Sequence, residues 1–536
     1  MSTQNSSEND EDDYRFVFTV NTQATTSGNT ISAIPFDLYT SGQQNGNTVT
    51  KQSGVTLTVD WGDGTTQTLS NSDYTSTDAT ASMHTYSEAG TYIIKVDCNN
   101  WSNCYFCSSG GTDASTQSDG YNDITPTNSS LRNRHLAYWK ETLISIDSSI
   151  KNIPGILEYA VEQPTESDVI FIDNSAHCMF YNCKKLSSIT PKLFKNLTYF
   201  THFYSTFEHA NSLVTIPTGL FSYNTAVTNF NRCFYGMKNL EIVPSTLFQK
   251  CVNVIDFTYL FATSPKLVRI PKGIFDYNVN AEIFTDIFQK CTALTEIPEN
   301  MFLYNTKATI FQSAFRKTNI EYIPDGLFGG CVSVTSYQQC FAECSKLKEI
   351  PKDLFINCGS VINMKQCFNQ CTSLTSLDED VFKGLVNVSS FEGTLRGCTR
   401  ITSIPQNLFR YNTKADNFNT TFSDFRVTTI PDGLFDNCVN ATKFQNTFQN
   451  CSLLTSIPID LFKYNVNAYT FTNCFFQCTS LNDFSVRIGS KKVSSCAGFV
   501  TLKENTTRIV YVPSGSTTQT KFNNVADGLG LTIIGE

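Results

Sequence analysis

The chain lacks any run of about 18 apolar residues, the minimum for a membrane-spanning helix, so no membrane insertion is expected. Charged residues make up only 16% of the sequence and the net charge is −9, so the basic stripe typical of nucleic-acid binding is missing. Tryptophan is scarce, with 3 residues, whereas phenylalanine contributes 42. This aromatic-rich, weakly charged composition indicates a folded chain rather than a disordered one.

The N-terminus, MSTQNSSENDEDDYRF, also lacks the apolar segment of a secretion signal. We expect residues 1–13 to be a disordered acidic tail. With no Sec-type signal visible, the protein either stays in the cytoplasm or leaves by another route, such as incorporation into a virus particle. A signal peptide upstream of the given start is a further alternative.

A 27-residue repeat organises most of the chain. In residues 291–315, CTALTEIPENMFLYNTKATIFQSAF, a Leu is followed by two variable residues, Ile-Pro, two more residues and Met-Phe. The spacing slips to 26 residues before Pro324 and Pro431. A period in this range is typical of a solenoid. The proline column consists of Pro217, Pro244, Pro271, Pro298, Pro324, Pro351, Pro405, Pro431 and Pro458; Thr190, Asp378 and Ser485 sit in the same register without a proline.

Each repeat is expected to contribute two short strands, one at the LxxIP segment and one ending at an aromatic residue, as in residues 281–284. The Leu, Ile and Phe columns should point inward and stack on their copies one repeat away. One column alternates between Asn and Cys, whose amide or thiol groups can serve backbone groups left unpaired by the turns. The asparagines are Asn224, Asn278, Asn305, Asn412 and Asn465.

Most of the 20 cysteines fall in such repeat columns, where they trade with Asn, Leu, Thr or Ser. This placement favours buried, free structural thiols over a disulfide framework. Neighbouring repeats would lie ~4.8 Å apart, so a bridge between Cys340 and Cys367 under oxidising conditions stays open. Cys98, Cys104 and Cys107 lack a second pair at zinc-ligand spacing, and we interpret them as incidental cysteines of a linker.

Residues 14–98 are expected to form a β-sandwich. The runs YRFVFTVN, GVTLTVDWGDGT and HTYSEAGTYIIKVDC alternate in hydrophobicity and are separated by Gly, Asn, Ser and Asp clusters. In the DWGDGT turn, Gly62 and Gly64 supply positive φ and Asp63 can bond its own backbone. A calcium site at Asp60 and Asp63 is disfavoured, because calcium prefers about six to eight oxygens.

Two family resemblances follow from these motifs. DWGDGT at residues 60–65, together with HTY at 84–86 and GTY at 90–92, resembles the polycystic-kidney-disease-type (PKD) domain, with 38–54 as an insertion. FQKCTALTEIPENMF and FAECSKLKEIPKDLF resemble BspA-like leucine-rich repeats, in the long Mycoplasma-lipoprotein-type variant. The closing IVYVPSGSTTQTKF resembles the terminal element that often follows such arrays.

The predicted fold class is therefore mainly β: an Ig-like/PKD-type β-sandwich followed by a leucine-rich-repeat solenoid of about eleven 27-residue coils. The predicted organisation is a tail at 1–13, the sandwich at 14–98, a linker at 99–135, an N-terminal solenoid cap at 136–177, the repeats at 178–485 and a C-terminal cap at 486–536.

No chemistry-bearing constellation stands out. The sequence contains no nucleophile motif, phosphate-cradling glycine loop or recurring acidic pair that departs from the repeat logic. His202 and His209 could meet across one repeat, but no third metal ligand is apparent. We therefore predict no catalytic residues, no cofactor and no metal, and a protein that is not an enzyme.

A candidate recognition surface lies in the middle of the array. The second residue after the repeat Leu should project from the open face, since its neighbours point inward. At this position the outer repeats carry mainly Thr and Ser, whereas the middle ones bring charge and an aromatic ring. Because Tyr and Arg dominate interfaces, we predict a central patch there, against the alternative of ordinary solvated residues. The patch consists of Arg269, Glu296, Glu321, Tyr322, Lys348 and Glu349.

The resemblances imply a non-enzymatic, surface-displayed adhesion or ligand-binding protein, whose partner is a host or bacterial surface protein or a glycan. One alternative is a structural virion protein, a fibre or decoration protein of a phage of gut bacteria. A glycan-directed enzyme is the third and less favoured hypothesis. The expected location is the cell surface, the extracellular space or a virion, and the sequence leaves the oligomeric state open.

Overall fold

The structure is a computed structural model that describes residues 15–22, 30–34, 36–37, 41–44, 47–50, 54–73, 83–108, 142–150, 153, 155–159 and 169–536. The predicted acidic tail and most of the predicted linker lie outside these residues. The chain divides into two compact units, Met1–Pro265 and Lys266–Glu536.

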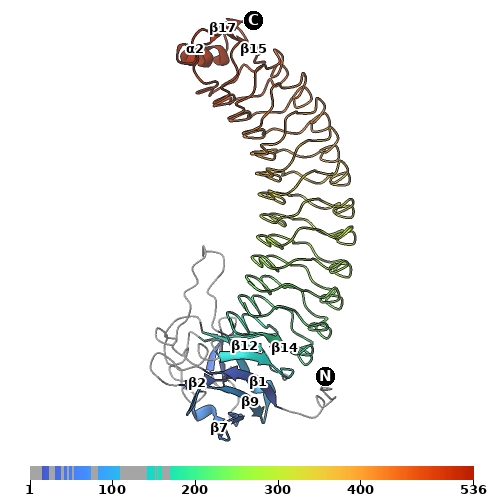
Figure 1. The fold of residues 1–536 in the computed structure, drawn as a ribbon, viewed down its shortest axis with the longest axis vertical. Helices are drawn as coiled ribbons and strands as arrows, with labels where there is room; N and C mark the ends of the chain where they lie inside the picture. The colour runs from blue at the N-terminus through green and yellow to red at the C-terminus, as the bar shows by residue number, and fades with distance from the viewer. Residues whose placement is uncertain are drawn as a thin grey trace. The chain divides into compact units, whose positions relative to one another are not determined.

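The first unit contains two six-stranded sheets and a two-stranded ribbon (Figure 1). The first sheet has the order β14-β11-β1-β9-β6-β7, and its strands are β1 (Phe16–Asn21), β6 (Thr56–Asp60), β7 (Thr66–Ser70), β9 (Thr91–Cys98), β11 (Leu143–Ile146) and β14 (Ser188–Ile189). The second has the order β3-β10-β12-β13-β4-β5, with β3 (Phe36–Asp37), β4 (Ser41–Gln44), β5 (Asn47–Thr50), β10 (Tyr105–Ser108), β12 (Gly155–Tyr159) and β13 (Val169–Asp173). The ribbon pairs β2 (Thr30–Ala33) with β8 (Met83–Tyr86).

Alternating burial explains the first sheet. Strand β1, FVFTVN, buries every second residue, and Phe16 meets Phe36 of the second sheet edge-to-face with ring centroids 5.3 Å apart. Strand pairing extends past residue 98: β11 pairs with β1, and β10 pairs with β3. The sheets therefore include strands from the segments predicted as linker and cap.

The fold class expected from the sequence is wrong. A mainly β chain with two strands in each coil of a solenoid would place strands throughout the repeats. In the part of the chain that the structure describes, the sheets are small, and no strand lies between Ile189 and Phe484. The repeats instead consist of turns joined by single-residue parallel bridges, such as Ile310↔Ser336 and Ser336↔Asn363.

Left-handed residues keep the second expected strand short. Each repeat holds one residue at φ of 50° to 61° two positions after the residue that ends this strand, as Asp286 follows Phe284, and extended strands do not tolerate such a value. A second left-handed residue follows four positions later, for example Glu343 after Gln339. The first column comprises Cys178, Ser205, Arg232, Tyr259, Asp286, Ser313, Gln339, Gln366, Gly393, Thr420, Asn446 and Asn473.

Despite these turns, the backbone remains paired between repeats. Alternate N–H groups of one repeat donate to alternate carbonyls of the next, including the N–H groups of the left-handed residues. The bonds run from Tyr337, Gln339, Phe341 and Glu343 to Asn363, Lys365, Cys367 and Asn369, at 3.0, 2.9, 2.9 and 2.6 Å. In the second unit, Figure 1 shows the repeats as successive loops in chain order, green through orange.

Aromatic columns fill the interior of the repeats. Phe311 is fully buried and stacks on Phe284 with centroids 5.1 Å apart and on Tyr337 at 5.8 Å. Phe315 and Phe341 form a second, nearly parallel column at 5.5 Å. The prediction that column rings stack on their copies one repeat away is confirmed.

The Asn and Cys column satisfies buried carbonyls, as predicted. The Asn305 amide donates to the carbonyls of Phe275 and Asn278 at 3.2 and 2.9 Å, and Asn412 makes the equivalent pair of bonds. Where the column carries cysteine, the Cys331 thiol donates to the Phe302 carbonyl at 3.6 Å. The described cysteines are free and buried, and burial raises the pKa of Cys344 to about 12.

The last repeats end in a three-stranded parallel sheet and a helix. The sheet order is β15-β16-β17, from β15 (Phe484–Arg487), β16 (Arg508–Val512) and β17 (Thr532–Gly535). Helix α2 (Thr517–Leu529) is capped by Ser516 and buries Phe522. The buried Arg508 guanidinium donates to the carbonyls of Leu481, Asn482 and Thr501, so it satisfies backbone acceptors of the final repeat.

Candidate functional site

An open groove of about 630 Å³ lies on the second unit, where three successive repeats turn their corners. We call it the corner groove. Tyr322, Pro324, Glu349, Pro351 and Asp378 are among its lining residues. Its other lining residues are Ile323, Asp325, Ile350, Lys352, Ser376 and Leu377.

A departure from the repeat pattern coincides with this groove. The third repeat has Leu377-Asp378 where the first two have Ile-Pro. Ile323 and Ile350 are 4% and 7% exposed, whereas the equivalent Leu377 is only half-buried. The Asp378 carboxylate accepts the backbone N–H of Asp380 at 2.8 Å, a short local bond typical of aspartate in turns. The loss of proline thus places a carboxylate and an apolar side chain at the groove.

Three residues of the predicted central patch come together beside the groove. The Lys348 ammonium lies 2.6 Å from the Glu321 carboxylate, donates to the Tyr322 hydroxyl at 3.2 Å and lies 4.8 Å from the centre of its ring. The hydrogen bond from Lys348 lowers the pKa of Glu321, and the same bond raises the pKa of Lys348. Tyr322 is 51% exposed, so this clamp holds an aromatic ring at the surface.

The other three patch residues are not part of this clamp. Glu349 is exposed and lines the corner groove. Arg269 and Glu296 are exposed in earlier repeats and do not line the groove. Of the predicted patch, Tyr322 and Glu349 line the corner groove; the prediction did not name Asp325, Lys352 and Asp378, which also line it. The signal for Asp378 was visible in the sequence, since it interrupts the proline column.

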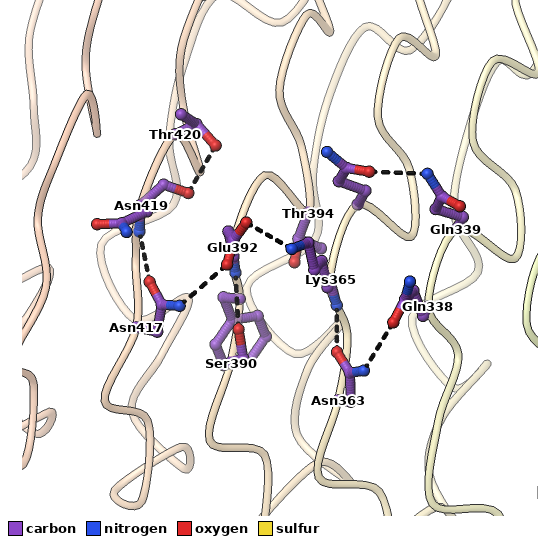
Figure 2. A network of polar contacts seen from close by, with 12 residues as sticks. Gln338, Gln339, Asn363, Lys365, Ser390, Glu392, Thr394, Asn417, Asn419 and Thr420 are labelled. Atoms are coloured by element: carbon purple, nitrogen blue, oxygen red, sulfur yellow. Dashed lines mark hydrogen bonds and ion pairs between the residues drawn. The ribbon is translucent and has the colours of Figure 1, made fainter.

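On a second polar surface of the repeats, the side chains bond to one another (Figure 2). We call it the amide face. The Glu392 carboxylate receives the Lys365 ammonium at 2.8 Å and the Asn417 amide at 3.2 Å, while Asn363 donates to Gln338 at 3.1 Å. In contrast, the side chains of Asp325, Glu349 and Lys352 form no hydrogen bond or ion pair with any residue that the structure describes.

The DWGDGT turn uses its aspartates for local structure. Asp63 accepts the N–H and hydroxyl of Thr65 at 3.0 and 2.6 Å and pairs with His84 at 2.7 Å. Burial would raise the pKa of Asp63, but the bonds from Thr65 and His84 outweigh it and lower the pKa to about 2. Asp60 accepts the N–H of Gly62 at 3.0 Å. Gly62 has φ +81°, and a Cβ there would lie 2.6 Å from the Ile93 carbonyl oxygen.

One histidine of the first repeats, His209, lies near a buried carboxylate. Glu208 is 2% exposed, accepts the Ser205 hydroxyl at 2.5 Å and lies 3.8 Å from Arg232 and 3.7 Å from His209. Burial raises its pKa to about 7, against the opposing effects of Ser205 and Arg232. Within the described ranges, no three His, Cys, Asp or Glu residues are grouped as metal ligands require. None of the helices described there is both long and apolar enough to cross a bilayer.

Comparison with known proteins leaves the chain without a family. No family model matches it, and no curated protein does. Among solved structures, it is similar to a chain of the Drosophila Toll–Spatzle complex, with 14% identity, a TM-score of 0.29 and coverage of 61% of this chain and 53% of that chain. A glycosylated form of that complex is similar with 14% identity, a TM-score of 0.25 and coverage of 64% of this chain and 57% of that chain.

A third similar structure is the plant peptide hormone receptor RGFR1 in complex with RGF2, with 11% identity, a TM-score of 0.12 and coverage of 73% of this chain and 95% of that chain. This chain spans about half the length of the Toll-complex chain that it matches, 53%. Similarities this distant assign neither fold nor function, so the function must be argued from the site itself.

Proposed function

We propose that this protein is a non-enzymatic ligand-binding protein whose recognition surface comprises the central patch and the corner groove. The observation that carries the proposal is the groove of about 630 Å³ beside the exposed ring of Tyr322. Small-ligand and peptide sites in proteins are commonly concave, with apolar walls and a few placed polar groups. The Lys348 clamp further supports it, since an aromatic ring held in one orientation loses less entropy on binding.

The finer parts of the proposal rest on the sequence motifs. We propose that the repeats are of the BspA-like kind, that the DWGDGT segment is PKD-like, and that the ligand is a surface protein or glycan of a host or bacterium. Display on a cell surface or as part of a virion are the two settings consistent with an adhesive role. Detection of the chain in purified phage particles, as opposed to an outer cell fraction, distinguishes them.

The test removes the patch and leaves the repeats intact. A variant carrying Arg269→Ala, Tyr322→Ala and Lys348→Ala is compared with the wild-type chain for binding of the fluorescently labelled protein to bacterial and epithelial cells. We expect at least a tenfold loss of binding, since Tyr and Arg truncations dominate interface losses. Unchanged binding by a variant with an unchanged circular dichroism spectrum and melting temperature contradicts the proposed surface.

A matched control uses repeat positions outside the patch. Thr429 and Ser456 occupy the same repeat position as Tyr322 and lie exposed in later repeats. Their replacement by alanine should leave binding unchanged. If the control variant loses as much binding as the patch variant, the effect comes from the array in general and the proposed surface is wrong.

A further inference from the structure

We propose that the corner groove binds an extended, lysine- or arginine-rich segment of a partner protein. This inference rests on the proposed function and names the class of ligand for the same surface. The groove is lined by three carboxylates, those of Asp325, Glu349 and Asp378, against the single ammonium of Lys352. A cationic segment therefore complements its charge, and charge complementarity contributes to partner selection.

The charges at the groove are available to a ligand. Ion pairs join side chains of nearby repeats, including Arg316 with Glu343 at 2.6 Å and Lys365 with Glu392 at 2.8 Å. Asp325 and Glu349 have no such partner among the residues that the structure describes. A basic ligand can pair with these carboxylates without first breaking an internal ion pair, so binding avoids that cost.

The backbone of the groove is also matched to a donor-rich ligand. Pro324 and Pro351 form corresponding corners of two successive repeats and have no N–H group to offer. At these two positions the backbone therefore offers an acceptor and no donor. Lysine and arginine side chains carry only donors, as does each N–H of an extended backbone.

The dimensions suit an extended chain that follows the direction in which the repeats succeed one another. Parallel bridges between repeats imply a spacing of ~4.8 Å, so Asp325 and Asp378, two repeats apart, are separated by roughly 10 Å along that direction. An extended segment rises ~3.3 Å per residue and presents alternate side chains to one face. Two basic residues with one residue between them can therefore reach both carboxylates with their long stems.

The clamp on Tyr322 favours this ligand over a glycan. Sugar recognition commonly uses an open aromatic face, but the Lys348 ammonium already lies 4.8 Å from the centre of the Tyr322 ring. The half-buried Leu377 and the prolines provide apolar walls for the aliphatic stems of lysine or arginine. The groove thus combines apolar contact along its walls with carboxylates at its rim.

The experiment uses the full chain and three short labelled peptides in which glycine alternates with lysine, glutamate or glutamine. Fluorescence anisotropy should show that the lysine peptide binds at least tenfold more tightly than the glutamate peptide. Raising the salt from about 0.05 M to about 0.5 M should weaken that binding about tenfold, because exposed charges are screened. Equal affinities for the lysine and glutamate peptides overturn the inference.

A charge-neutral variant locates the binding to the groove. Asp325→Asn, Glu349→Gln and Asp378→Asn keep the shape, and the amide introduced at position 378 retains an oxygen for the Asp380 N–H. We expect about a tenfold loss of affinity for the lysine peptide, or roughly twofold for each of the three exposed charges. Asp432, which follows Pro431 as Asp325 follows Pro324, is the matched control, and Asp432→Asn should change the affinity less than about twofold. An equal loss in the control variant overturns the inference.

The outcomes separate the inference from the proposed function. A chain that binds cells through Tyr322 but prefers no basic peptide, or that binds a neutral oligosaccharide in the groove, retains the proposed function and refutes the basic segment. A chain whose cell binding is insensitive to the patch variant refutes both.

Discussion

The sheets of the first unit and the repeats pair their backbones in different ways. Strands β1 and β9 pair over six successive residues, from Phe16↔Val96 to Asn21↔Thr91. A repeat forms one bridge, such as Ile310↔Ser336, and then continues its hydrogen bonds through left-handed residues. Both regions satisfy their buried N–H and carbonyl groups, which is what folding requires. Extended geometry is thus one way among others to achieve regular pairing between chain segments.

The two regions also differ in how they use ionisable groups. In the DWGDGT turn the environment lowers the pKa of Asp63 to about 2, whereas burial in the repeats raises the pKa of Glu208 to about 7. The sheets therefore gain stability from a charged carboxylate, and the first repeats lose stability when theirs becomes charged. Five predictions test these contrasts, beginning with the largest effect.

Phe311→Ala should destabilise the repeats by about 3–5 kcal/mol, because it removes a fully buried ring from a stacked column. All three tryptophans precede residue 140, so their fluorescence reports on the N-terminal part, while circular dichroism reports on the whole chain. Urea unfolding should show a lower midpoint by circular dichroism. Phe18→Ala, in β1, should lower the midpoint by fluorescence, and the reverse assignment of the two effects would contradict the comparison.

Asn412→Ala should cost about 2–4 kcal/mol, since the carbonyls of Phe382 and Leu385 lose their donor while remaining buried. Asn412→Cys provides the control, because cysteine occupies this column in other repeats and the Cys331 thiol reaches a carbonyl there. In thermal unfolding, the alanine variant should have a lower melting temperature than the cysteine variant. Equal melting temperatures would show that the column does not act through its donor.

Glu208→Gln should remove the contribution of this carboxyl group to the pH dependence of the free energy of unfolding. A folded-state pKa near 7, against an ordinary value of 4.5, means that the folded chain binds the extra proton between these values. The contribution is therefore complete below pH 4.5 and is lost as the pH rises through 7. At pH well above 7 the variant should be more stable than wild type by on the order of 2–3 kcal/mol, and the two should converge in acid. Parallel stability curves across that range would disprove this effect.

Gly393→Ala should cost about 1–2 kcal/mol, because residue 393 has φ +61° and a Cβ would lie 3.1 Å from the Gln366 side chain. At Gly359 an added Cβ would stand in open space, so Gly359→Ala should change the free energy of unfolding by less than about 0.5 kcal/mol. Chemical denaturation measures both. A larger loss at Gly359 would contradict the assignment of left-handed geometry to the column.

Asp63→Asn should have the smallest effect, less than about 1 kcal/mol near neutral pH, since the pair with His84 is partly exposed. Because the folded pKa of about 2 lies below the ordinary 3.8, the wild-type contribution is present above 3.8 and is lost as the pH falls through 2. Trp61 stacks on His84 with ring centroids 4.9 Å apart, so its fluorescence is the measurement. A variant with the wild-type acid transition would refute the role of Asp63.

Much of the repeat region could be predicted from the sequence. The aromatic, Asn and Cys columns are buried. Because buried positions accept few residue types, these columns repeat visibly in the sequence and reveal the period. The left-handed column leaves no such signal, since its members include Arg232, Tyr259 and Gln339, and glycine only at 393. Hydrogen bonds between repeats hold these residues in the left-handed conformation, and their residue types have no local preference for it. For that reason the sequence did not predict how soon the second extended segment of each repeat ends.

The candidate site was predictable to the same limited extent. Glu321, Tyr322 and Lys348 meet because in-register positions of adjacent repeats are neighbours, which the period alone implies. The shape of the corner groove depends on how deeply the Leu377 side chain is buried. Its charge depends on which ionisable side chains form no ion pair. Both are properties of packing, and the sequence signals only the missing proline at 378.

The left-handed columns have a consequence for how such a gene can change. In the ladder that runs through the left-handed residues, each N–H group donates to a carbonyl about one period further along the chain. Duplicating or deleting one whole unit of 27 codons would leave every surviving donor opposite an equivalent acceptor. Loss of a single codon within the ladder would shift the left-handed residues against their partners. The number of repeats can therefore evolve in steps of one unit, while the corner groove changes by single substitutions.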